Sequence, residues 1–361
     1  MPLPDLRLAL LGLLLCVASL VQAAPRIGIA TMEPGEIFWE RFGHNAILVE
    51  DADGGEILSY NFGFFDPEEP NFYWNFIRGR MQYQLLALDI EQDLWWYRET
   101  GRGVTVQWLR LTPEQAWRLA ADLAENARPE NARYAYDYYR ANCSTRVRDA
   151  LDRAMDGQLY RQLSGRSLGN TYRSETVRLT APAPWLATGL HLGLADYGDR
   201  PLSRWDEAFV PMRLRDSLRE VRLADGGSLV ESEQTLLPHS LPLPADVPPR
   251  LAGRALLLGL AVAAAALLLG RRKPRVLAGF AALFWLGTGL AGIVLAFIWV
   301  YTAHVAGYGN ENLLLFSPLA LALLPGAWQQ LRGREAPRYF RILLMILLGM
   351  SALAAFIKLL P

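Results

Sequence analysis

The sequence predicts an α+β domain exported from the cytoplasm, followed by a region of four transmembrane helices. Three observations support this fold class: an apolar run at the N-terminus, strand and helix patterns between residues 24 and 235, and four apolar stretches after residue 250. The 361 residues contain 36 Lys and Arg, 36 Asp and Glu, and 52% hydrophobic residues. This composition excludes a disordered chain and a strongly basic nucleic-acid-binding protein.

The N-terminus has the features of a secretory signal peptide. Arg7 precedes an apolar run from Leu8 to Val21, and Val21-Gln22-Ala23 forms a small-x-small cleavage site. We therefore expect residues 1–23 to be a signal peptide, with a first transmembrane helix as the alternative. Cleavage after Ala23 would leave Cys143 as the single cysteine of the mature chain, which excludes an internal disulfide.

A β-hairpin is predicted near the start of the exported domain, which we expect to cover residues 24–235. Residues 44–50 form the first strand candidate, Asp51–Gly55 a turn rich in Gly and Asp, and residues 56–63 the returning strand. Apolar residues that alternate with polar ones between 104 and 108 predict a further half-buried strand.

Two helices are predicted after these strands. Thr112-Pro113-Glu114-Gln115 combines an N-cap, a proline at the first helical position and a capping-box glutamine, so a helix should run from there to about Ala127. A second helix should begin near Asn142, with one face formed by Val147, Ala150, Leu151 and Met155. Residues 157–235 show no such pattern and are predicted to be rich in loops.

The C-terminal part is predicted to be a tether followed by membrane spans. Residues 236–250 contain five prolines, which is typical of an extended, semi-rigid linker. Four apolar stretches follow, and each is close to the ~20 residues that cross ~30 Å of hydrocarbon. They cover about residues 251–269, 276–300, 313–328 and 340–357.

The charges around these stretches predict their orientation. Residues 251–361 hold ten Lys and Arg against two Asp and Glu, and these basic residues gather at 271–275 and 332–341. The loop at 301–312 has no Lys or Arg. Because positively charged loops stay in the cytoplasm, we expect the α+β domain and the 301–312 loop to face the outer side together.

Three glycines in the second stretch need separate consideration. Gly287, Gly289 and Gly292 match the spacing of a dinucleotide-binding loop, but that motif requires a strand before it and a helix that starts at it. These glycines lie inside an apolar helix instead. We therefore expect them to allow close packing against a neighbouring helix.

Few residues could carry nucleophilic chemistry. Of the four histidines, His239 lies in the proline-rich tether and is expected to be solvated, and His191 has no polar neighbours in the sequence. His44 begins a predicted strand, and Cys143 lies in the first turn of a predicted helix. Unpaired N–H groups there would lower the thiol pKa and could hold an oxyanion. Cys143 and His44 are thus a candidate nucleophile and base, with an inert buried thiol as the alternative.

The base needs a third group to orient it, and the hairpin offers candidates. Pairing Glu50 with Glu56 puts residue 62 opposite His44, whereas a one-residue bulge puts Asn61 there, with Tyr60 on the diagonal. Asn61 is the preferred orienting residue, although it could equally be a polar residue that only adjoins the turn.

Several motifs occur in a recognisable order. They are Phe42-Gly43-His44-Asn45-Ala46, Tyr60-Asn61-Phe62-Gly63-Phe64-Phe65-Asp66, Pro70-Asn71-Phe72, Arg78-Gly79-Arg80 through Tyr83, and Asn142-Cys143-Ser144-Thr145-Arg146 with Asp149. With them, most of residues 27–235 resembles the Lnb-type family of bacterial lipoprotein N-acyltransferases. A looser match follows in the membrane part, where Ser317 replaces an expected Asn: His304, Asn310-Glu311-Asn312-Leu313-Leu314 and Pro318.

The resemblance implies a permuted papain-like fold, similar to NlpC-type proteins, in which the His strand precedes the Cys helix. It implies His44 as base and Cys143 as nucleophile, with Asn61 and Asn142 as supporting residues. The implied reaction moves an acyl chain from a phospholipid, through a cysteine thioester, to the N-terminal amine of a diacylglyceryl lipoprotein. The reaction would take place at the periplasmic face of the bacterial inner membrane and would need no metal and no cofactor.

Other readings remain open at this point. The same Cys and His pair could serve a papain-like cell-wall amidase or peptidase, and a non-catalytic membrane scaffold is a third possibility. An ion transporter is disfavoured because the spans contain no Asp, Glu or Lys. The aromatic run Phe72–Phe76 could line an acyl groove, touch lipid or pack in the core, and Arg78 and Arg80 could bind phosphate or be solvated. His304 could face the active site or cap a helix.

Overall fold

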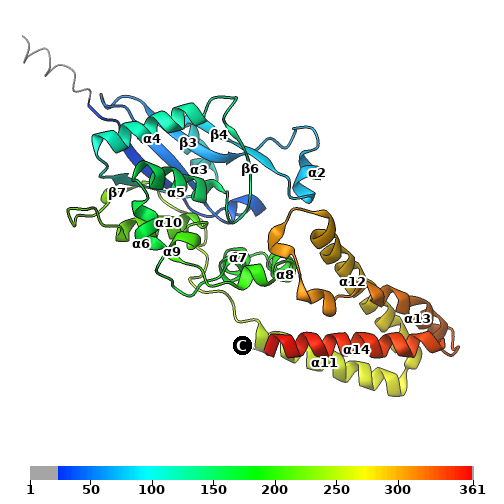
Figure 1. The fold of residues 1–361 in the computed structure, drawn as a ribbon. Helices are drawn as coiled ribbons and strands as arrows, with labels where there is room; N and C mark the ends of the chain where they lie inside the picture. Colours follow the sequence, from blue (N-terminus) through cyan, green and yellow to red (C-terminus); the bar gives the residue numbers. More distant parts are fainter. Residues whose placement is uncertain (1–22, 360–361) are drawn as a thin grey trace, which may run out of the picture. The chain divides into compact units, whose positions relative to one another are not determined.

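A computed structural model describes residues 23–359, so most of the predicted signal peptide lies outside the described residues. The described chain forms two compact units (Figure 1). The first unit holds the chain up to Pro67, Gln82–Gly169 and Leu202–Leu243. The second unit holds Glu68–Met81, Asn170–Pro201 and the chain from Pro244 onward. Two segments that precede residue 235 therefore belong to the same unit as the apolar helices.

The first unit is built on a seven-stranded antiparallel sheet in the order β6-β4-β3-β2-β1-β5-β7. The predicted first strand of the hairpin is confirmed as β2, and its partner β3 is displaced by one residue from the prediction. The final strand continues two residues into the predicted tether. The strands are β1 (Arg26–Met32), β2 (His44–Glu50), β3 (Ile57–Phe64), β4 (Gln82–Asp89), β5 (Val104–Leu109), β6 (Arg133–Ala135) and β7 (Val230–Leu237).

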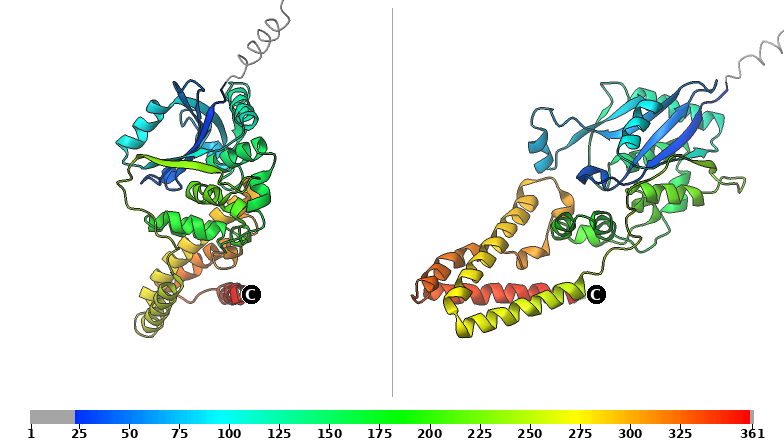
Figure 2. Two further views of the ribbon diagram at one scale, coloured as in Figure 1. Left: turned by 90° about the vertical axis from the view of Figure 1, so that its left-hand side faces the viewer. Right: turned by 180° about the vertical axis from the view of Figure 1, so that it is seen from behind.

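Helices cover both faces of this sheet (Figure 2). On one face, α4 (Pro113–Asn126) and α5 (Cys143–Ala154) bury Leu119 and Leu151 against strand residues such as Ile47. On the other face, α3 (Ile90–Glu99) buries Leu94 and Tyr97 in a cluster with Ala46 and Leu48 of β2. Both predicted helices are confirmed, together with the predicted apolar face of α5 and the capping box of α4.

The prediction that residues 157–235 are rich in loops is wrong. These residues form a series of helices of four to ten residues each, which is too short for an apolar period of 3.6 residues to be visible in the sequence. Local signals still mark their starts, since Thr171 and Ser203 make capping boxes and Pro184 and Pro211 occupy first helical positions. The helices are α6 (Gln158–Leu163), α7 (Tyr172–Thr180), α8 (Pro184–Gly193), α9 (Arg204–Glu207) and α10 (Pro211–Glu220).

The second unit contains the apolar helices. Within the described residues, four helical segments are long and apolar enough to cross a membrane by length and composition. Three of them are continuous: α11 (Ala252–Arg272), α12 (Pro274–Tyr301) and α14 (Arg338–Leu359). The third of the four in chain order is broken into η4 (Glu311–Leu314), η5 (Pro318–Leu323) and α13 (Leu324–Leu331).

This break differs from the continuous helix expected over residues 313–328, and prolines explain it. Pro318 and Pro325 lack the N–H that a helix interior uses and clash with the preceding turn. The broken segment packs closely on α12, because a Cβ at Gly289 would lie 2.6 Å from Leu321 and one at Gly292 would overlap the carbonyl of Phe316. The predicted packing role of these two glycines is confirmed.

Candidate active site

His44 is the first residue of β2, which is an interior strand of the sheet. Gly43 precedes it with a φ of 77°, a left-handed conformation that favours glycine. A Cβ at Gly43 would also lie only 2.8 Å from the carbonyl oxygen of Met32, the residue that pairs with His44 across β1. The turn therefore requires a glycine in order to place the imidazole at the end of the strand.

Cys143 is the first residue of α5, and Asn142 is its N-cap. The side-chain oxygen of Asn142 accepts a hydrogen bond from the backbone N–H of Thr145 (2.9 Å), and the hydroxyl of Thr145 accepts one from the backbone N–H of Asn142 (2.9 Å). The amide nitrogen of Asn142 donates to the carbonyl of Phe209 (2.8 Å). Asn142 thus holds the start of the helix, and with it the thiol, in place.

The imidazole of His44 and the thiol of Cys143 stabilise each other's charged form. Burial disfavours the imidazolium, but the charge of Cys143, its hydrogen bond and the charge of Asp93 together raise the pKa of His44 above its usual value. Burial likewise opposes the thiolate, but His44 and the backbone N–H groups of Asn45 and Ser144 lower the pKa of Cys143. The two residues therefore favour a thiolate–imidazolium pair.

Asn61 determines which nitrogen of His44 faces the thiol. Its side-chain oxygen lies 2.9 Å from Nε2 of His44, and its amide nitrogen donates to Asp93 Oδ2 at 3.0 Å. Because the carboxylate only accepts, the amide orientation of Asn61 is fixed and its oxygen accepts from Nε2–H. Nε2 is therefore protonated, and Nδ1 is the nitrogen left for the thiol.

Asn61 occupies this position through a strand register that differs from the prediction. Glu50 pairs with Ile57, so Asn61 stands opposite Ala46 and not opposite His44. The turn contains one residue more than expected, which shifts every pair of the hairpin. Asn61 still shares a sheet face with His44, two positions along, and its side chain covers that spacing.

Asp93 is a member of this cluster that the sequence did not reveal. It lies on α3 with 8% of its surface exposed, and its Oδ2 accepts from Ser59 Oγ at 2.6 Å as well as from Asn61. Its spacing from Ile90 and Tyr97 places it on the buried face of the helix. An acidic residue within an apolar helix face was the available signal, because such a carboxylate must be paired.

A second polar cluster joins β2 to α5 behind the thiol. Asn45 is fully buried, and its amide nitrogen donates to Thr31 Oγ1 at 2.9 Å. Its side-chain oxygen accepts from the hydroxyl of Ser144 at 2.8 Å. Since Asn45 follows His44 and Ser144 follows Cys143, these bonds fix the relative position of the two reactive residues.

Gly63 and Tyr134 border the other side of Cys143. Gly63 has a φ of 95° at an irregularity of β3, and a Cβ there would lie 3.6 Å from Cβ of Cys143 and 3.8 Å from the hydroxyl oxygen of Tyr134. That hydroxyl is buried and has no hydrogen-bond partner in the described part of the chain. Burial raises its pKa, so it remains a neutral donor. The guanidinium of Arg146 stacks on its ring at 4.3 Å.

His304 and His239 have backbone partners. Nε2 of His304 lies 3.1 Å from the carbonyl oxygen of Phe76 and 3.2 Å from that of Ile77, at the end of α2 (Phe72–Ile77). Of the two readings of His304, its contacts are those of a helix cap. The expectation that His239 is solvated is wrong: it is half-buried, and its Nδ1 accepts from the N–H of Gly103 at 3.0 Å.

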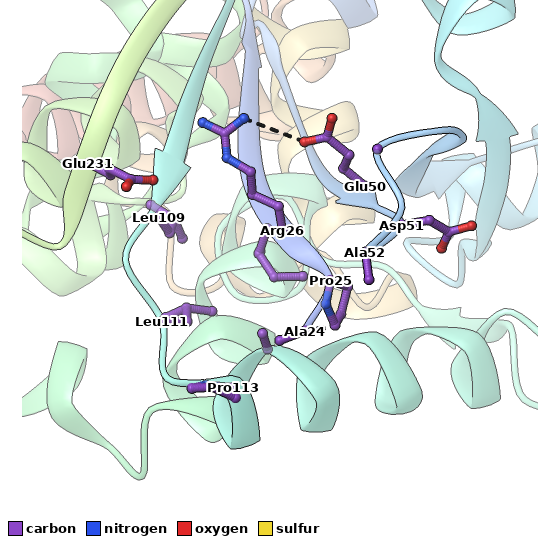
Figure 3. A pocket seen from close by; sticks show the side chains of 13 residues that line it. Ala24, Pro25, Arg26, Glu50, Asp51, Ala52, Leu109, Leu111, Pro113 and Glu231 are labelled. Carbon is purple, nitrogen blue, oxygen red and sulfur yellow. Dashed lines mark hydrogen bonds and ion pairs between the residues drawn. The ribbon is translucent and has the colours of Figure 1, made fainter. Parts of the chain in front are cut away.

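A surface hollow lies at the opposite end of the strands (Figure 3). It is bordered by an ion pair between Arg26 and Glu50 at 3.5 Å, and its lining contains neither Cys nor His. Glu50 is six residues from His44 along β2, which is about 20 Å at ~3.3 Å per residue. Among residues 23–359, no group of three His, Cys, Asp or Glu side chains could hold a metal ion. The reactive groups therefore gather at the His44 end of the sheet.

Family models match both parts of the chain. Residues 23–182 match the Lnb N-terminal periplasmic domain, and residues 249–358 match the Lnb transmembrane domain. No curated protein and no solved structure shows a significant match. The chain is thus a membrane protein with a periplasmic domain. Because the two matches cover most of the sequence in this order, the chain belongs to the Lnb family.

Proposed function

We propose that the protein is a cysteine-dependent N-acyltransferase that matures lipoproteins at the bacterial inner membrane. The observation that carries the proposal is that Cys143, the first residue of a helix, is hydrogen-bonded to His44, and that each residue shifts the pKa of the other toward its charged form. A periplasmic domain joined to a membrane region gives such a thiol two lipidic substrates in one compartment. The donor is a phospholipid, and the acceptor is the N-terminal cysteine of a diacylglyceryl lipoprotein.

The first half-reaction forms an acyl-enzyme. The thiolate of Cys143 attacks the ester carbonyl of the phospholipid, and the electron pair moves onto the carbonyl oxygen. The buried hydroxyl of Tyr134, which has no hydrogen-bond partner in the described chain, is proposed to donate to this oxyanion. As the intermediate collapses, the carbon–oxygen bond of the ester breaks and the leaving oxygen takes the Nδ1 proton of His44. A lysophospholipid departs, and His44 is neutral.

The second half-reaction transfers the acyl chain to the lipoprotein. Neutral His44 accepts a proton from the α-amine as its nitrogen attacks the thioester carbonyl. Collapse forms the amide and releases the thiolate, so the resting pair with the imidazolium returns. An α-amine has a pKa near ~8, so a useful fraction is neutral at physiological pH. The thioester separates two difficult steps, which is why an activating cofactor is not required.

Three polar residues support this cycle without reacting. Asn61 keeps Nε2 protonated through both half-reactions, and the buried carboxylate of Asp93 fixes the amide of Asn61 and stabilises the imidazolium. Asn142 holds the helix start. A strand that carries the base, followed by a helix that carries the nucleophile, is the order expected of a permuted papain-like domain.

The chain is proposed to cross the inner membrane several times. The basic segments at residues 271–275 and 332–341 would lie in the cytoplasm, and the uncharged loop at 301–312 in the periplasm. A structural contact supports this independently. The backbone N–H of Ala303 donates to the carbonyl of Arg78 at 2.8 Å, and Arg78 belongs to the matched periplasmic domain.

The proposal can be tested in cells depleted of their own lipoprotein N-acyltransferase. Mass spectrometry of a model lipoprotein should show a triacylated N-terminus with the wild type and a diacylated one with Cys143→Ala or His44→Ala. The exposed residue Glu130 provides a control, since Glu130→Ala should support triacylation. Triacylation by Cys143→Ala would exclude the proposed mechanism. Diacylated product with every variant and with the wild type would indicate a cell-wall hydrolase or a scaffold instead.

A further inference from the structure

The short helix α2 exposes an unusual set of side chains. Tyr73, Trp74 and Ile77 are 69%, 51% and 47% exposed, and none of the residues of α2 is buried. Their spacing places all three on one side of the helix. Adjacent large apolar side chains on a protein surface mark a site of contact with a partner or a membrane. The core-packing reading therefore does not hold for Tyr73 and Trp74, whereas Phe72 and Phe76 are half-buried.

The helix is attached to the end of a membrane span. Its last carbonyls are bound by Nε2 of His304, and the carbonyl of Arg78 is bound by the N–H of Ala303 at 2.8 Å. Gly79 makes this approach possible, because its φ is 68° and a Cβ there would lie 2.9 Å from the backbone nitrogen of His304. The span itself, α12, ends at Tyr301. Only one residue, Thr302, separates the span from the contact.

The end of α12 has the character of a membrane–water boundary. Its 28 residues extend about 42 Å, which exceeds the ~30 Å hydrocarbon thickness and brings its end to the headgroup level. Trp299 and Tyr301 are 48% and 68% exposed there, as in the aromatic belts of membrane proteins. Since α2 is held to this end by hydrogen bonds, its exposed face lies at the same level.

We propose that α2 is an interfacial helix that lies on the periplasmic surface of the bilayer. Its occupant is the phospholipid surface itself, with Trp74, Tyr73 and Ile77 at the boundary between headgroups and acyl chains. The guanidinium of Arg78, 5.6 Å from the ring centre of Trp74, and the exposed Arg80 supply positive charge for lipid phosphates. The inference rests on the membrane part of the chain and is independent of the proposed acyl transfer.

Spin labelling of the full chain tests this placement. With Cys16 and Cys143 replaced by Ser, a nitroxide is attached to Trp74→Cys in phosphatidylethanolamine and phosphatidylglycerol vesicles. The label should collide with oxygen more often than with a water-soluble nickel complex, and a label at the exposed span residue Leu283 should give the same order. A label at Glu130 serves as the aqueous reference. If the label at position 74 meets the nickel complex as often as the one at position 130, the proposal fails.

A conservative variant keeps the test valid if the labelled chain does not fold. Trp74→Phe retains an aromatic side chain, so the difference in emission between wild type and variant isolates Trp74. In vesicles with dibrominated acyl chains, we expect that difference emission to be quenched at least about twofold relative to vesicles without bromine. An unquenched Trp74 would overturn the proposal, whether or not the chain transfers acyl groups.

Discussion

His44 and His304 show how two regions of one chain use the same side chain differently. In the first unit, the ring of His44 lies between a thiol and an amide that is fixed by a buried carboxylate. In the second unit, the ring of His304 faces two backbone carbonyls of α2, which do not titrate. The thiol of Cys143 can exchange a proton with His44, whereas the carbonyl oxygens of Phe76 and Ile77 can only accept a hydrogen bond from His304. The surroundings, and not the residue type, separate a candidate base from a structural cap.

The largest effect on the rate should come from removing His44, and removal of His304 provides the comparison. His44→Ala should slow formation of the acyl-enzyme by about 10⁴-fold, because the thiolate loses its counter-ion and the leaving oxygen its proton source. His304→Ala should retain the rate within about tenfold. Single-turnover labelling of Cys143 with a phospholipid analogue, followed by intact-mass spectrometry, measures both. Equal losses in the two variants would remove the distinction between these regions.

A smaller effect is expected from Tyr134→Phe. The substitution removes only the hydroxyl that is proposed to donate to the oxyanion, so the rate should fall by about 10²-fold. Folding should be unaffected, since this buried hydroxyl has no partner to lose. The same acylation assay and a thermal melt provide the two measurements. An unchanged rate would show that the oxyanion is held by backbone groups alone.

Asp93→Asn should move the alkaline limb of the pH profile to lower pH, with a rate loss of about tenfold at neutral pH. The charge of Asp93 helps to raise the pKa of His44, so its removal lowers that pKa. As the pH rises, the variant therefore loses its imidazolium, and with it the acylation rate, at a lower pH than the wild type does. The pH profile of the acylation rate in wild type and variant shows the direction. An alkaline limb that stays in place or moves upward would contradict the role of Asp93.

The smallest effect concerns stability and not rate. His304→Ala should lower the melting temperature by about 2–4 °C, as expected for the loss of one hydrogen-bonded cap in a chain of this size. His304→Gln can still donate to the same carbonyls and should recover part of the loss. Calorimetry in detergent measures both variants against Glu130→Ala. A melting temperature that does not change would show that the contacts of His304 contribute nothing.

Local signals accounted for much of the predicted fold and site. The capping residues Asn142 and Thr112 act on the next three residues of the chain, so their patterns predicted the starts of α5 and α4. The start of β2 at His44 was likewise predicted from the local pattern of strand, turn and returning strand. These features depend on neighbours in sequence, and a single sequence contains that information.

The parts that were missed depend on contacts between distant residues. Asn61 was chosen correctly as a neighbour of His44, but its register depends on the length of a turn that the sequence does not define. Asp93 and Tyr134 join the site from α3 and β6, and neither spacing nor composition links them to Cys143. The helices after residue 157 were missed because each is too short to show a period.

The broken third apolar segment has a consequence for how the chain is made. Its mean hydropathy is 1.2, against 2.1 to 2.3 for the other three segments, and it is the most buried of the four inside the protein. The interruption at residues 315–317, before Pro318, leaves backbone groups that lipid cannot satisfy. The segment packs instead on Gly289 and Gly292 of α12. During biosynthesis, we therefore expect this segment to enter the bilayer as the second arm of a hairpin, and only after α12 is available to receive it.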